Sequence, residues 1–562
     1  MKMYVGTNCS ERRWFALLVA LAGLAVVVYL RAMTVPGSLE LDPLAIEDDA
    51  RQFLTWLPRL RDPALLQDDL LADYWWSVSP PLYRAMFEAA AALGLAPMVL
   101  AQLLPCVVIP LTILAAWWLA RGVLDRPAMA FFAVVLMTMS LHLRTPVSTP
   151  APRVFADPLF LLFLGALVRD RAPVMVVAIG LMAALYPPVA VTALSLLMLS
   201  RIRMSPRPGL DLSPRSLVLV FAAVGVAVAV VFPFVSASHP WQPTLTLDEA
   251  RGMANFMSND GRSRIVLHTG EIGWLCGGRI GFLPSIFSCK RPFDAATLIS
   301  IAMLVPVLAL LVRALRKGRS ADRREVLLYG GVLLAAVVWF TIAAVLAFKL
   351  HLPSRYSQRP IRFVEMLALV QAFAVWGAPW LRSRCPLCLK AGGIAMIAVA
   401  VVTFGWPKAA EHPQDPPAMA WLAQTAPETR IGGVSDELAF VPSLLGRSIL
   451  ASPEHAIPYH LGYFREVERR LIDMLTVAST ADAEEMRAIL DRYGLDVFVV
   501  DRAFLEERVL PKYYGRTIPE EAHAAVERMA ARPPVLAARA AECTSFAGKS
   551  LIVLDARCLG RE

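Results

Sequence analysis

Residues 39–84 read LELDPLAIEDDARQFLTWLPRLRDPALLQDDLLADYWWSVSPPLYR and lie between two strongly apolar segments. The stretch is rich in acidic and aromatic residues, and it contains an acidic pair, Asp48 and Asp49. A long acidic and aromatic loop between two membrane spans suggests that the loop has a function of its own. We therefore interpret this stretch as the catalytic loop of a membrane enzyme, and the rest of the chain tests that interpretation.

The composition indicates a mainly α, polytopic membrane protein. The chain has 562 residues, of which 57% are hydrophobic and only 18% charged, with a mean hydropathy of +0.55. Soluble domains are about half apolar and about a quarter charged. The net charge of +9 does not indicate a nucleic-acid partner, because the Lys and Arg residues cluster at the ends of apolar segments, where membrane topology explains them.

About eleven apolar segments predict transmembrane helices, with ends uncertain by several residues. The first is long for a signal peptide and no small-residue cleavage site follows it, so we expect it to be retained. The fifth and sixth are short and meet at Pro187 and Pro188, where two prolines cannot continue a helix. One long kinked span is the alternative, and it would invert every later loop. The predicted spans are 14–30, 98–120, 128–143, 154–168, 173–186, 188–199, 217–234, 295–312, 326–348, 363–380 and 391–404.

Basic residues decide the orientation. With a cytoplasmic N-terminus and the prolines facing out, the Lys and Arg clusters at span ends fall inside, which is the positive-inside pattern. The loops 33–97 and 236–294 and the tail 407–562 then lie outside. We expect an integral protein of the bacterial inner (plasma) membrane, in which residues 1–406 form the membrane domain. In the tail, amphipathic helices alternate with short apolar strands, which predicts a small extracytoplasmic α/β domain.

The cysteines fit this orientation. Two predicted pairs, Cys276 with Cys289 and Cys543 with Cys558, lie in external segments, where an oxidising compartment allows disulfides. Cys385 and Cys388 fall inside. Their spacing matches a CxxC motif, but no second pair completes a zinc site, so we expect them to be reduced thiols.

Polar residues gather at the external ends of the spans, whereas the middles of the spans are almost free of charge. Arg153 and Asp157 lie at one such end. A second group is basic, which is unusual for an external loop, and an anionic lipid phosphate bound by Arg explains it. The alternative is that these side chains reach ordinary lipid phosphates or pair with carboxylates. The residues predicted to bind substrate here are Lys349, Arg355, Tyr356 and Arg359.

The acidic residues are candidates for general-base catalysis beside that phosphate. Asp48 and Asp49 are adjacent and point in different directions, so one could act as the base while the other binds Arg or a metal. The alternative is that they cap a helix that begins near Ala50. Asp69 and Asp73 are a second candidate set for substrate binding, although Asp is common in loops and caps.

The aromatic residues of the same stretch have two interpretations. Trp75, Trp76 and Tyr83 either anchor the loop at the membrane interface or stack on a sugar ring, and we favour anchors. Pro80 and Pro81 predict the start of a helix over 82–93 on the membrane surface.

Several short motifs together resemble the GT-C superfamily of integral-membrane glycosyltransferases. They are Asp48-Asp49, Asp-x-x-x-Asp-Tyr from Asp69 to Tyr74, Pro80-Pro-Leu-Tyr83, Tyr186-Pro-Pro188 and Pro353-Ser-Arg-Tyr356. The resemblance implies a donor sugar linked to a polyprenyl phosphate. It also implies that Asp48 or Asp49 is the base or a metal ligand, and that Arg355 binds the donor phosphate.

The same resemblance has limits that bear on the acceptor and the cofactor. The chain lacks the Trp-Trp-Asp-Tyr-Gly motif of oligosaccharyltransferases, so glycosylation of peptide sequons is not expected, and the layout is closer to the aminoarabinose- and mannose-transferring branches. A divalent cation, Mg or Mn, is compatible with such a loop. No Asp-x-Asp surrounds Asp48 and Asp49, which weakens the case for an obligatory metal, and we assign no metal ligands.

We therefore expect an inverting glycosyltransferase that moves a sugar from a polyprenyl-phosphate donor to an extracytoplasmic envelope glycan or lipid. A transporter or flippase for a lipid-linked sugar is one alternative, and a non-catalytic membrane scaffold is another. The enzyme requires Asp48 or Asp49 to lie within about one sugar-phosphate length of Arg355, roughly 10 Å.

Overall fold

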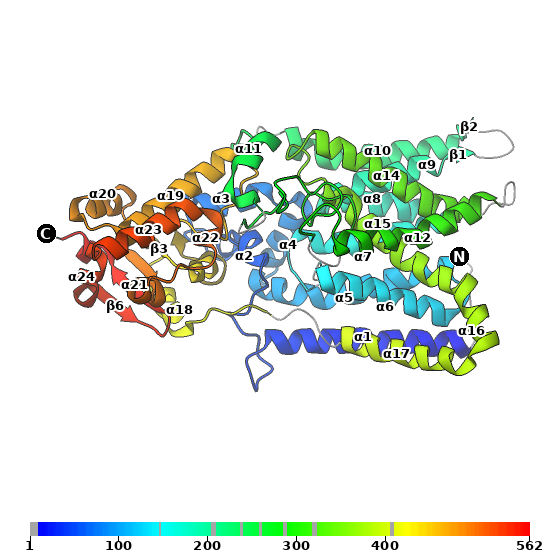
Figure 1. The fold of residues 1–562 in the computed structure, drawn as a ribbon, viewed down its shortest axis with the longest axis horizontal. Helices are drawn as coiled ribbons and strands as arrows, with labels where there is room; N and C mark the ends of the chain where they lie inside the picture. The colour runs from blue at the N-terminus through cyan, green and yellow to red at the C-terminus, as the bar shows by residue number, and fades with distance from the viewer. Residues whose placement is uncertain are drawn as a thin grey trace.

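The computed structural model describes residues 9–144, 148–203, 209–236, 240–257, 261–284, 289–316, 323–404 and 410–561. The molecule is elongated, with a helical bundle at one end and a small α/β domain at the other (Figure 1). The N- and C-termini lie at opposite ends of the long axis.

Eleven helical segments form the bundle within the described residues, in the places that the sequence predicts. Seven are long and apolar enough to cross a membrane. The segments are α1 (Cys9–Met33), α5 (Pro97–Val123), α6 (Pro127–Arg144), α7 (Ala156–Val168), α8 (Ala172–Leu185), α9 (Pro187–Leu199), α10 (Pro214–Ser236), α12 (Ala295–Arg316), the continuous helix from α13 (Arg323–Glu325) to α14 (Val332–Val345), the helix from α15 (Ser354–Ala372) to α16 (Ala378–Arg384), and α17 (Pro386–Phe404).

Proline marks the beginning of several of these helices. Pro97, Pro127, Pro187, Pro214 and Pro386 are each the first residue of their helix. Proline has no backbone N–H, but the first N–H of a helix has no partner within the helix, and the ring already holds φ near the helical value. The chain therefore uses proline to set where its apolar helices start.

The two prolines after Tyr186 separate two helices rather than kink one. Asp170 precedes α8 and Arg201 follows α9, yet their side chains form an ion pair at 3.0 Å. The two helices are therefore antiparallel, with Tyr186 at their turn. This settles the alternative that the sequence leaves open.

The helix ends opposite the α/β domain are tied together by ion pairs of basic residues. Arg121 pairs with Glu11 at 3.1 Å, and Arg201 pairs with Asp170. The basic ends that the positive-inside rule places in the cytoplasm thus gather at one end of the bundle. Which end faces the cytoplasm stays a prediction.

The C-terminal part is an α/β domain, as predicted. Its five-stranded sheet has the order β4-β3-β5-β7-β6. Strands β4, β3 and β5 run parallel to one another, and β7 pairs antiparallel with both of its neighbours, β5 and β6. The predicted boundary at 406/407 lies outside the described residues and stays a prediction. The elements are α18 (Pro416–Ala423), β3 (Arg430–Val434), β4 (Ser448–Ile449), α19 (Leu461–Ser479), α20 (Ala483–Tyr493), β5 (Val497–Asp501), α21 (Arg502–Glu507), α22 (Tyr514–Thr517), α23 (Pro519–Ala531), α24 (Val535–Cys543), β6 (Thr544–Ala547), β7 (Leu551–Asp555) and α25 (Ala556–Leu559).

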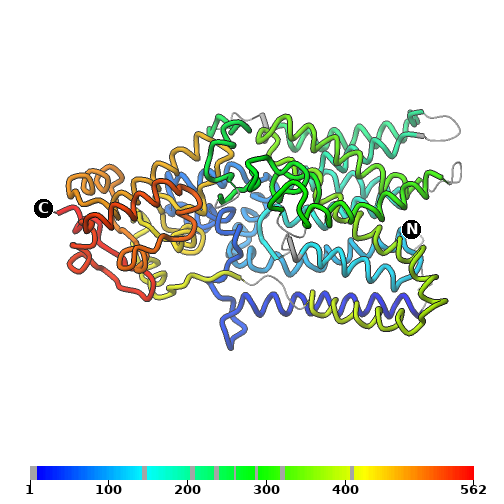
Figure 2. The backbone as a smooth tube through the Cα atoms, in the orientation of Figure 1, coloured from blue at the N-terminus to red at the C-terminus, as the bar shows by residue number. Residues whose placement is uncertain are grey.

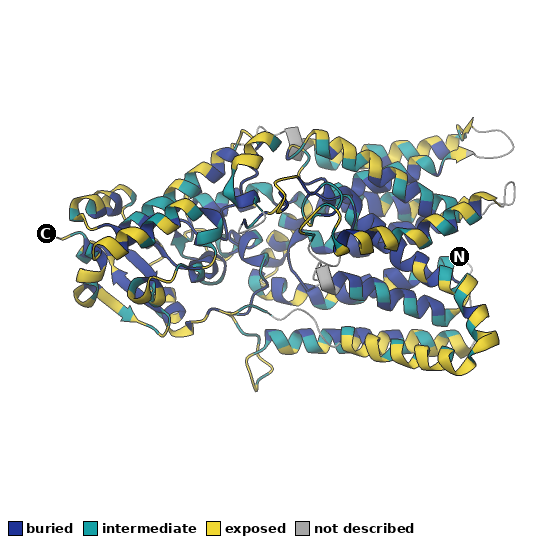
Figure 3. Cartoon of the chain, in the orientation of Figure 1, coloured by how far each residue is buried: buried dark blue, intermediate teal, exposed yellow. Residues whose placement is uncertain are grey.

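The two large loops lie between the bundle and this domain (Figure 2). The first loop contains short helices, and α4 is the helix predicted over 82–93. One buried core joins both loops to the α/β domain (Figure 3). For example, the ring of Tyr74 stacks on that of Tyr463 with 3.6 Å between centroids. The short elements outside the sheet domain are α2 (Ala50–Phe53), η1 (Leu57–Leu60), α3 (Leu70–Val78), α4 (Pro81–Ala92), η2 (Pro152–Phe155), β1 (Ile202–Arg203), β2 (Gly209–Leu210), α11 (Leu247–Gly252) and η3 (Ala254–Phe256).

Two of the three aromatic residues interpreted as membrane anchors are core residues instead. Trp75 and Tyr83 are 4% and 0% exposed. Only Trp76 is half-exposed, with the Arg84 guanidinium 4.2 Å from its ring. Trp75 and Tyr83 belong to the core that joins the loops to the α/β domain, so their rings are not available to lipid.

The structure joins Cys276 to Cys289 and Cys543 to Cys558. It also joins Cys385 to Cys388, contrary to the expectation of reduced thiols. These two lie at the sharp break between α16 and α17, which brings their Cα atoms to 5.2 Å, a normal separation for a disulfide.

Candidate functional site

Asp48 and Asp49 precede α2 and point in different directions. The Asp48 carboxylate binds the Arg51 guanidinium at 2.5 Å. Asp49 is the N-cap residue of α2, but its side chain makes no capping hydrogen bond. The helix does begin at Ala50, yet the carboxylates are not used to cap it.

The Asp49 carboxylate instead forms an ion pair with Arg153, which belongs to η2 at the start of α7. Arg153 also lies 3.9 Å from Glu47. Burial alone would raise the pKa of the Asp49 carboxyl, but the charges of the surrounding arginines outweigh it and hold that pKa below its usual range. Asp49 is therefore ionised at neutral pH.

Four arginines act on Asp49, and we call them the arginine cluster: Arg153, Arg262, Arg279 and Arg355. Arg262 and Arg279 come from the second loop, Arg153 from the bundle before α7, and Arg355 from the first turn of α15. The fold thus brings one carboxylate of the first loop to a group of cations from distant parts of the chain.

Arg355 is the least compensated member of the cluster. Within the described part of the chain its guanidinium forms no ion pair, and its Nε is buried without a hydrogen-bond partner. The charges of Arg153, Arg279 and Arg359 repel it. An unpaired guanidinium between other cations is a site for an anion.

The α/β domain closes the other side of the site. Arg51 pairs with Asp48 and also lies 3.1 Å from Glu411 and 3.5 Å from Glu454. Arg262 binds the same Glu454 at 2.5 Å. Glu454 is buried, so this network holds Asp48 firmly and couples the first loop to the domain.

The structure gives the other basic candidates different surroundings from Arg355. Arg359 forms a buried ion pair with Asp157. The Tyr356 hydroxyl donates to the Leu350 carbonyl at 2.8 Å. Lys349 is exposed, and the contacts that the described residues make do not join it to Asp49.

The two residues of the second acidic set contact other parts of the folded loop, Asp69 in its core and Asp73 nearer its surface. Asp69 caps α3 by accepting from the Ala72 N–H at 2.8 Å, and it accepts from the Ser448 hydroxyl at 2.6 Å. Asp73 pairs with Arg59 at 2.6 Å. The Tyr83 hydroxyl donates to the Pro150 carbonyl at 2.9 Å. None of these contacts reaches the arginine cluster in the described residues.

The described residues contain no group of three or more His, Cys, Asp or Glu side chains arranged to hold a metal ion. Asp48 and Asp49 face guanidinium groups instead, so the carboxylates present do not form a ready metal site. A divalent cation stays a prediction.

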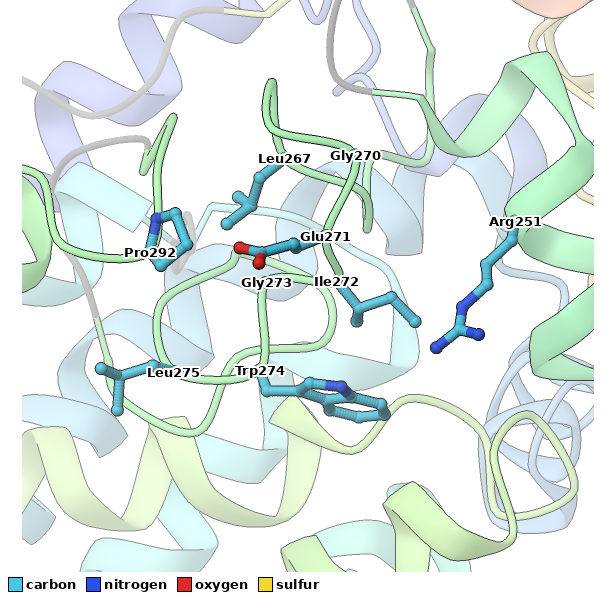
Figure 4. Close-up of a pocket in the computed structure, with 9 residues that line it drawn as sticks. All are labelled: Arg251, Leu267, Gly270, Glu271, Ile272, Gly273, Trp274, Leu275 and Pro292. Carbon is cyan, nitrogen blue, oxygen red and sulfur yellow. The ribbon is translucent and has the colours of Figure 1, made fainter.

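A separate cavity of about 590 Å³ lies in the second loop (Figure 4). It is lined by Glu271 and Trp274 and by Arg251 at the end of α11. The residues that line it do not include Asp48, Asp49 or any member of the arginine cluster.

Sequence reasoning did not assign Arg262, Arg279 or Glu454 to the site. They lie alone in segments without a motif, hundreds of residues from Asp49. Arg153 was visible only as a charge at the external end of a span. Only contacts made in the folded chain identify these residues.

Neither a family model nor a curated protein matches the chain. Solved structures do. The oligosaccharyltransferase of Archaeoglobus fulgidus in the apo form superposes with a TM-score of 0.51 at 11% identity, over 91% of this chain and 72% of that chain. The archaeal oligosaccharyltransferase AglB from the same organism, in complex with an inhibitory peptide and a dolichol-phosphate, gives 0.51 at 12% identity, over 92% and 72%. At this identity the superpositions establish the fold alone, and the chain shares the fold of these oligosaccharyltransferase structures over about nine tenths of its length.

Proposed function

We propose that this protein is a glycosyltransferase that moves a sugar from a polyprenyl-phosphate donor to an extracytoplasmic envelope glycan or lipid. The observation that carries the proposal is the unpaired Arg355 guanidinium beside an ionised Asp49. One group suits a phosphate, and the other suits the hydroxyl that attacks the sugar.

The chemistry is a single displacement at the anomeric carbon. The acceptor oxygen attacks from the face opposite the phosphate, the bond from the anomeric carbon to the phosphate oxygen breaks, and the electron pair stays on the phosphate. Attack from the opposite face inverts the configuration.

Asp49 takes the acceptor proton in this mechanism. Its lowered pKa makes it a weak base, so transfer of the proton is favourable only once the acceptor oxygen has begun to bond and has become acidic. Arg153 holds the carboxylate in place, and Arg355 stabilises the departing phosphate.

The fold supports the donor class and leaves the acceptor open. One structure with this fold contains a dolichol-phosphate together with an inhibitory peptide. The present chain lacks the Trp-Trp-Asp-Tyr-Gly motif, so we propose a glycan or lipid acceptor rather than a peptide sequon. The bacterial inner membrane, with Asp49 on its outer side, is the proposed location.

The test is sugar transfer from a labelled polyprenyl-phosphate sugar in membranes that contain wild type, Arg355→Ala or Lys349→Ala at matched expression. Lys349 is the control, because it is a cation near the start of the same helix with no tie to Asp49. Arg355→Ala should lower transfer roughly 10- to 100-fold, the loss expected for a charged hydrogen bond. Lys349→Ala should stay within about two-fold, as exposed charges contribute little.

The same assay separates the alternatives. Movement of the donor across the membrane without transfer would support a flippase, and the absence of both activities would support a scaffold. Removal of divalent cations with a chelator, followed by addition of Mg²⁺ or Mn²⁺, tests the cation requirement.

A further inference from the structure

The walls of the cavity in the second loop are fixed by the fold of the loop itself. Val266 and Ile272 pair across a hairpin as an antiparallel bridge. The disulfide between Cys276 and Cys289 then joins the end of this hairpin to the segment that contributes Pro292 to the lining. The cavity is therefore formed before a ligand binds, which lowers the entropy cost of binding.

The lining combines apolar side chains, one aromatic ring and two opposite charges. Leu267 and Ile272 are 7% and 9% exposed, Trp274 is half-buried, and Arg251 and Glu271 are exposed. Figure 4 shows the Arg251 guanidinium pointing toward the side of the cavity where the Trp274 ring lies. The volume of about 590 Å³ is within the range of small-molecule sites, which pair an apolar lining with a few polar groups.

These groups fit a neutral sugar. A sugar ring has a face of C–H groups that packs on an aromatic ring, and hydroxyls at its edge that bond to a carboxylate and a guanidinium. Arg251 lies 3.5 Å from Asp248, and Glu271 adds a further negative charge, so the cavity has no excess of positive charge to attract a phosphate. An acyl chain would gain nothing from either charge. The cavity thus differs in chemistry from the arginine cluster.

The path of the chain keeps the cavity near the arginine cluster. Trp274 and Arg279 are five residues apart, so their Cα atoms lie at most about 18 Å from each other. The Phe282 N–H donates to the Trp274 carbonyl at 2.8 Å, so the chain leaves the cavity, passes Arg279 and returns. Arg279 in turn acts on Asp49. The cavity therefore lies within reach of an oligosaccharide whose end is at Asp49.

We propose that this cavity binds one sugar unit of a neutral glycan acceptor, several units away from the one that is glycosylated. This rests on the proposed function and narrows its acceptor from a glycan or lipid to a glycan. Trp274 stacks on the sugar ring, and Glu271 and Arg251 bond its hydroxyls. Because the contact is remote from the reacting atoms and equal in ground state and transition state, it lowers KM and leaves kcat unchanged.

The experiment measures binding of neutral trisaccharides to the purified full-length chain in lipid nanodiscs. The probes are maltotriose, mannotriose, galactotriose and chitotriose, detected by saturation-transfer NMR and calorimetry, with inorganic phosphate as competitor. The variants are Trp274→Ala, Trp274→Phe and Glu271→Gln. The matched controls are Trp76→Ala and Glu428→Gln, a partly exposed ring and an exposed carboxylate that do not line the cavity.

Wild type should bind at least one trisaccharide, and inorganic phosphate should not compete. Trp274→Ala should weaken binding roughly 10- to 100-fold, as expected for a central aromatic contact, and Trp274→Phe should retain part of the affinity. Glu271→Gln should weaken binding roughly 10-fold, and because Glu271 is exposed this variant should fold normally. Both controls should stay within about two-fold of wild type.

Sugar transfer to oligosaccharides of increasing length supplies the second readout. Trp274→Ala should raise KM for the longer acceptors and leave kcat, and transfer to a single sugar unit, unchanged.

Binding of no trisaccharide by folded wild type would overturn the glycan site and leave transfer to a lipid acceptor intact. Unchanged affinity in both Glu271→Gln and folded Trp274→Ala would overturn it as well, because the sugar would then bind elsewhere. Competition by inorganic phosphate would contradict a neutral ligand. Trisaccharide binding without any transfer from a polyprenyl-phosphate sugar would overturn the acceptor role together with the proposed function.

Discussion

The loop between α1 and α5 carries two acidic sets, and the structure gives them opposite environments. Asp49 lies among four arginines that come from elsewhere in the chain, and its side chain makes no capping hydrogen bond to its own helix. Asp69 caps a helix and bonds a serine of the α/β domain, and its side chain is 3% exposed. The first carboxylate is held by cations, and we propose that it takes part in the reaction; the second is held by hydrogen bonds that stabilise the fold.

This contrast teaches that an acidic motif does not identify its own role. Asp49 and Asp69 each come directly before a short helix, α2 and α3 respectively. The side chains that distinguish them lie 100 to 400 residues away along the chain, such as Arg153 for Asp49 and Ser448 for Asp69.

Removing the arginine partner of each set should give a large difference in sugar transfer between the two variants. Arg153→Ala should lower sugar transfer roughly 10- to 100-fold per folded molecule, because Asp49 loses the group that orients it. Arg59→Ala removes the partner of Asp73 and should leave transfer within about two-fold. Rates measured in membranes at matched levels of folded protein decide this, and equal losses would show that both sets serve the reaction.

Asp69→Ala should act on stability instead. It removes a helix cap and leaves the partly buried Ser448 hydroxyl without its acceptor, so unfolding should become easier by about 1–3 kcal/mol. Thermal or denaturant unfolding of the purified chain measures this. Transfer per folded molecule should be unchanged, and a selective loss of transfer would instead assign Asp69 to the site.

The two carboxylates should respond to acid with opposite signs. The lowered pKa of Asp49 gives stability that is present above about pH 4 and is lost as the pH falls through the folded pKa. Burial raises the pKa of Asp69, so its charge costs stability at neutral pH, and that cost disappears as the pH falls through its folded pKa.

Unfolding curves between pH 3 and pH 7 check these signs. Relative to Asp49→Asn, wild type should lose stability at the acid end. Relative to Asp69→Asn, wild type should gain stability as the pH falls toward about 4. The same sign for both pairs would mean that the environments of the two carboxylates are alike.

The smallest effect should come from Asp73→Asn. Its side chain is 46% exposed and pairs with Arg59 near the surface. Exposed ion pairs contribute about 0–1 kcal/mol, so the free energy of unfolding should change by less than that. A change above about 2 kcal/mol would place Asp73 in a network that its exposure does not indicate.

The sequence was sufficient for the fold because membrane spans and prolines leave strong local patterns. The span positions, the turn at Pro187 and the helix after Pro80 follow from apolar length and from backbone chemistry. The site was only partly predictable. Asp49 and Arg355 could be selected from charges at the predicted external ends of spans, whereas Arg279 is held by a hydrogen bond from Ser354 of α15 that no local pattern encodes.

The aromatic residues show the same limit. Trp75 and Tyr83 are residue types typical of membrane interfaces, but both are buried in the core that joins the loops to the α/β domain. Sequence reasoning does not predict the burial of a side chain when segments far away in the chain determine it.

The most direct test compares Asp49→Asn with Asp73→Asn in sugar transfer from a polyprenyl-phosphate donor, with both variants shown to be folded. The substitution keeps size and removes charge, and the two residues share one loop. We predict that Asp49→Asn lowers transfer at least roughly 100-fold, the contribution of a general base, and that Asp73→Asn stays within about two-fold of wild type. Full transfer by Asp49→Asn would contradict the assignment of Asp49 to the reaction and with it the central difference between the two acidic sets.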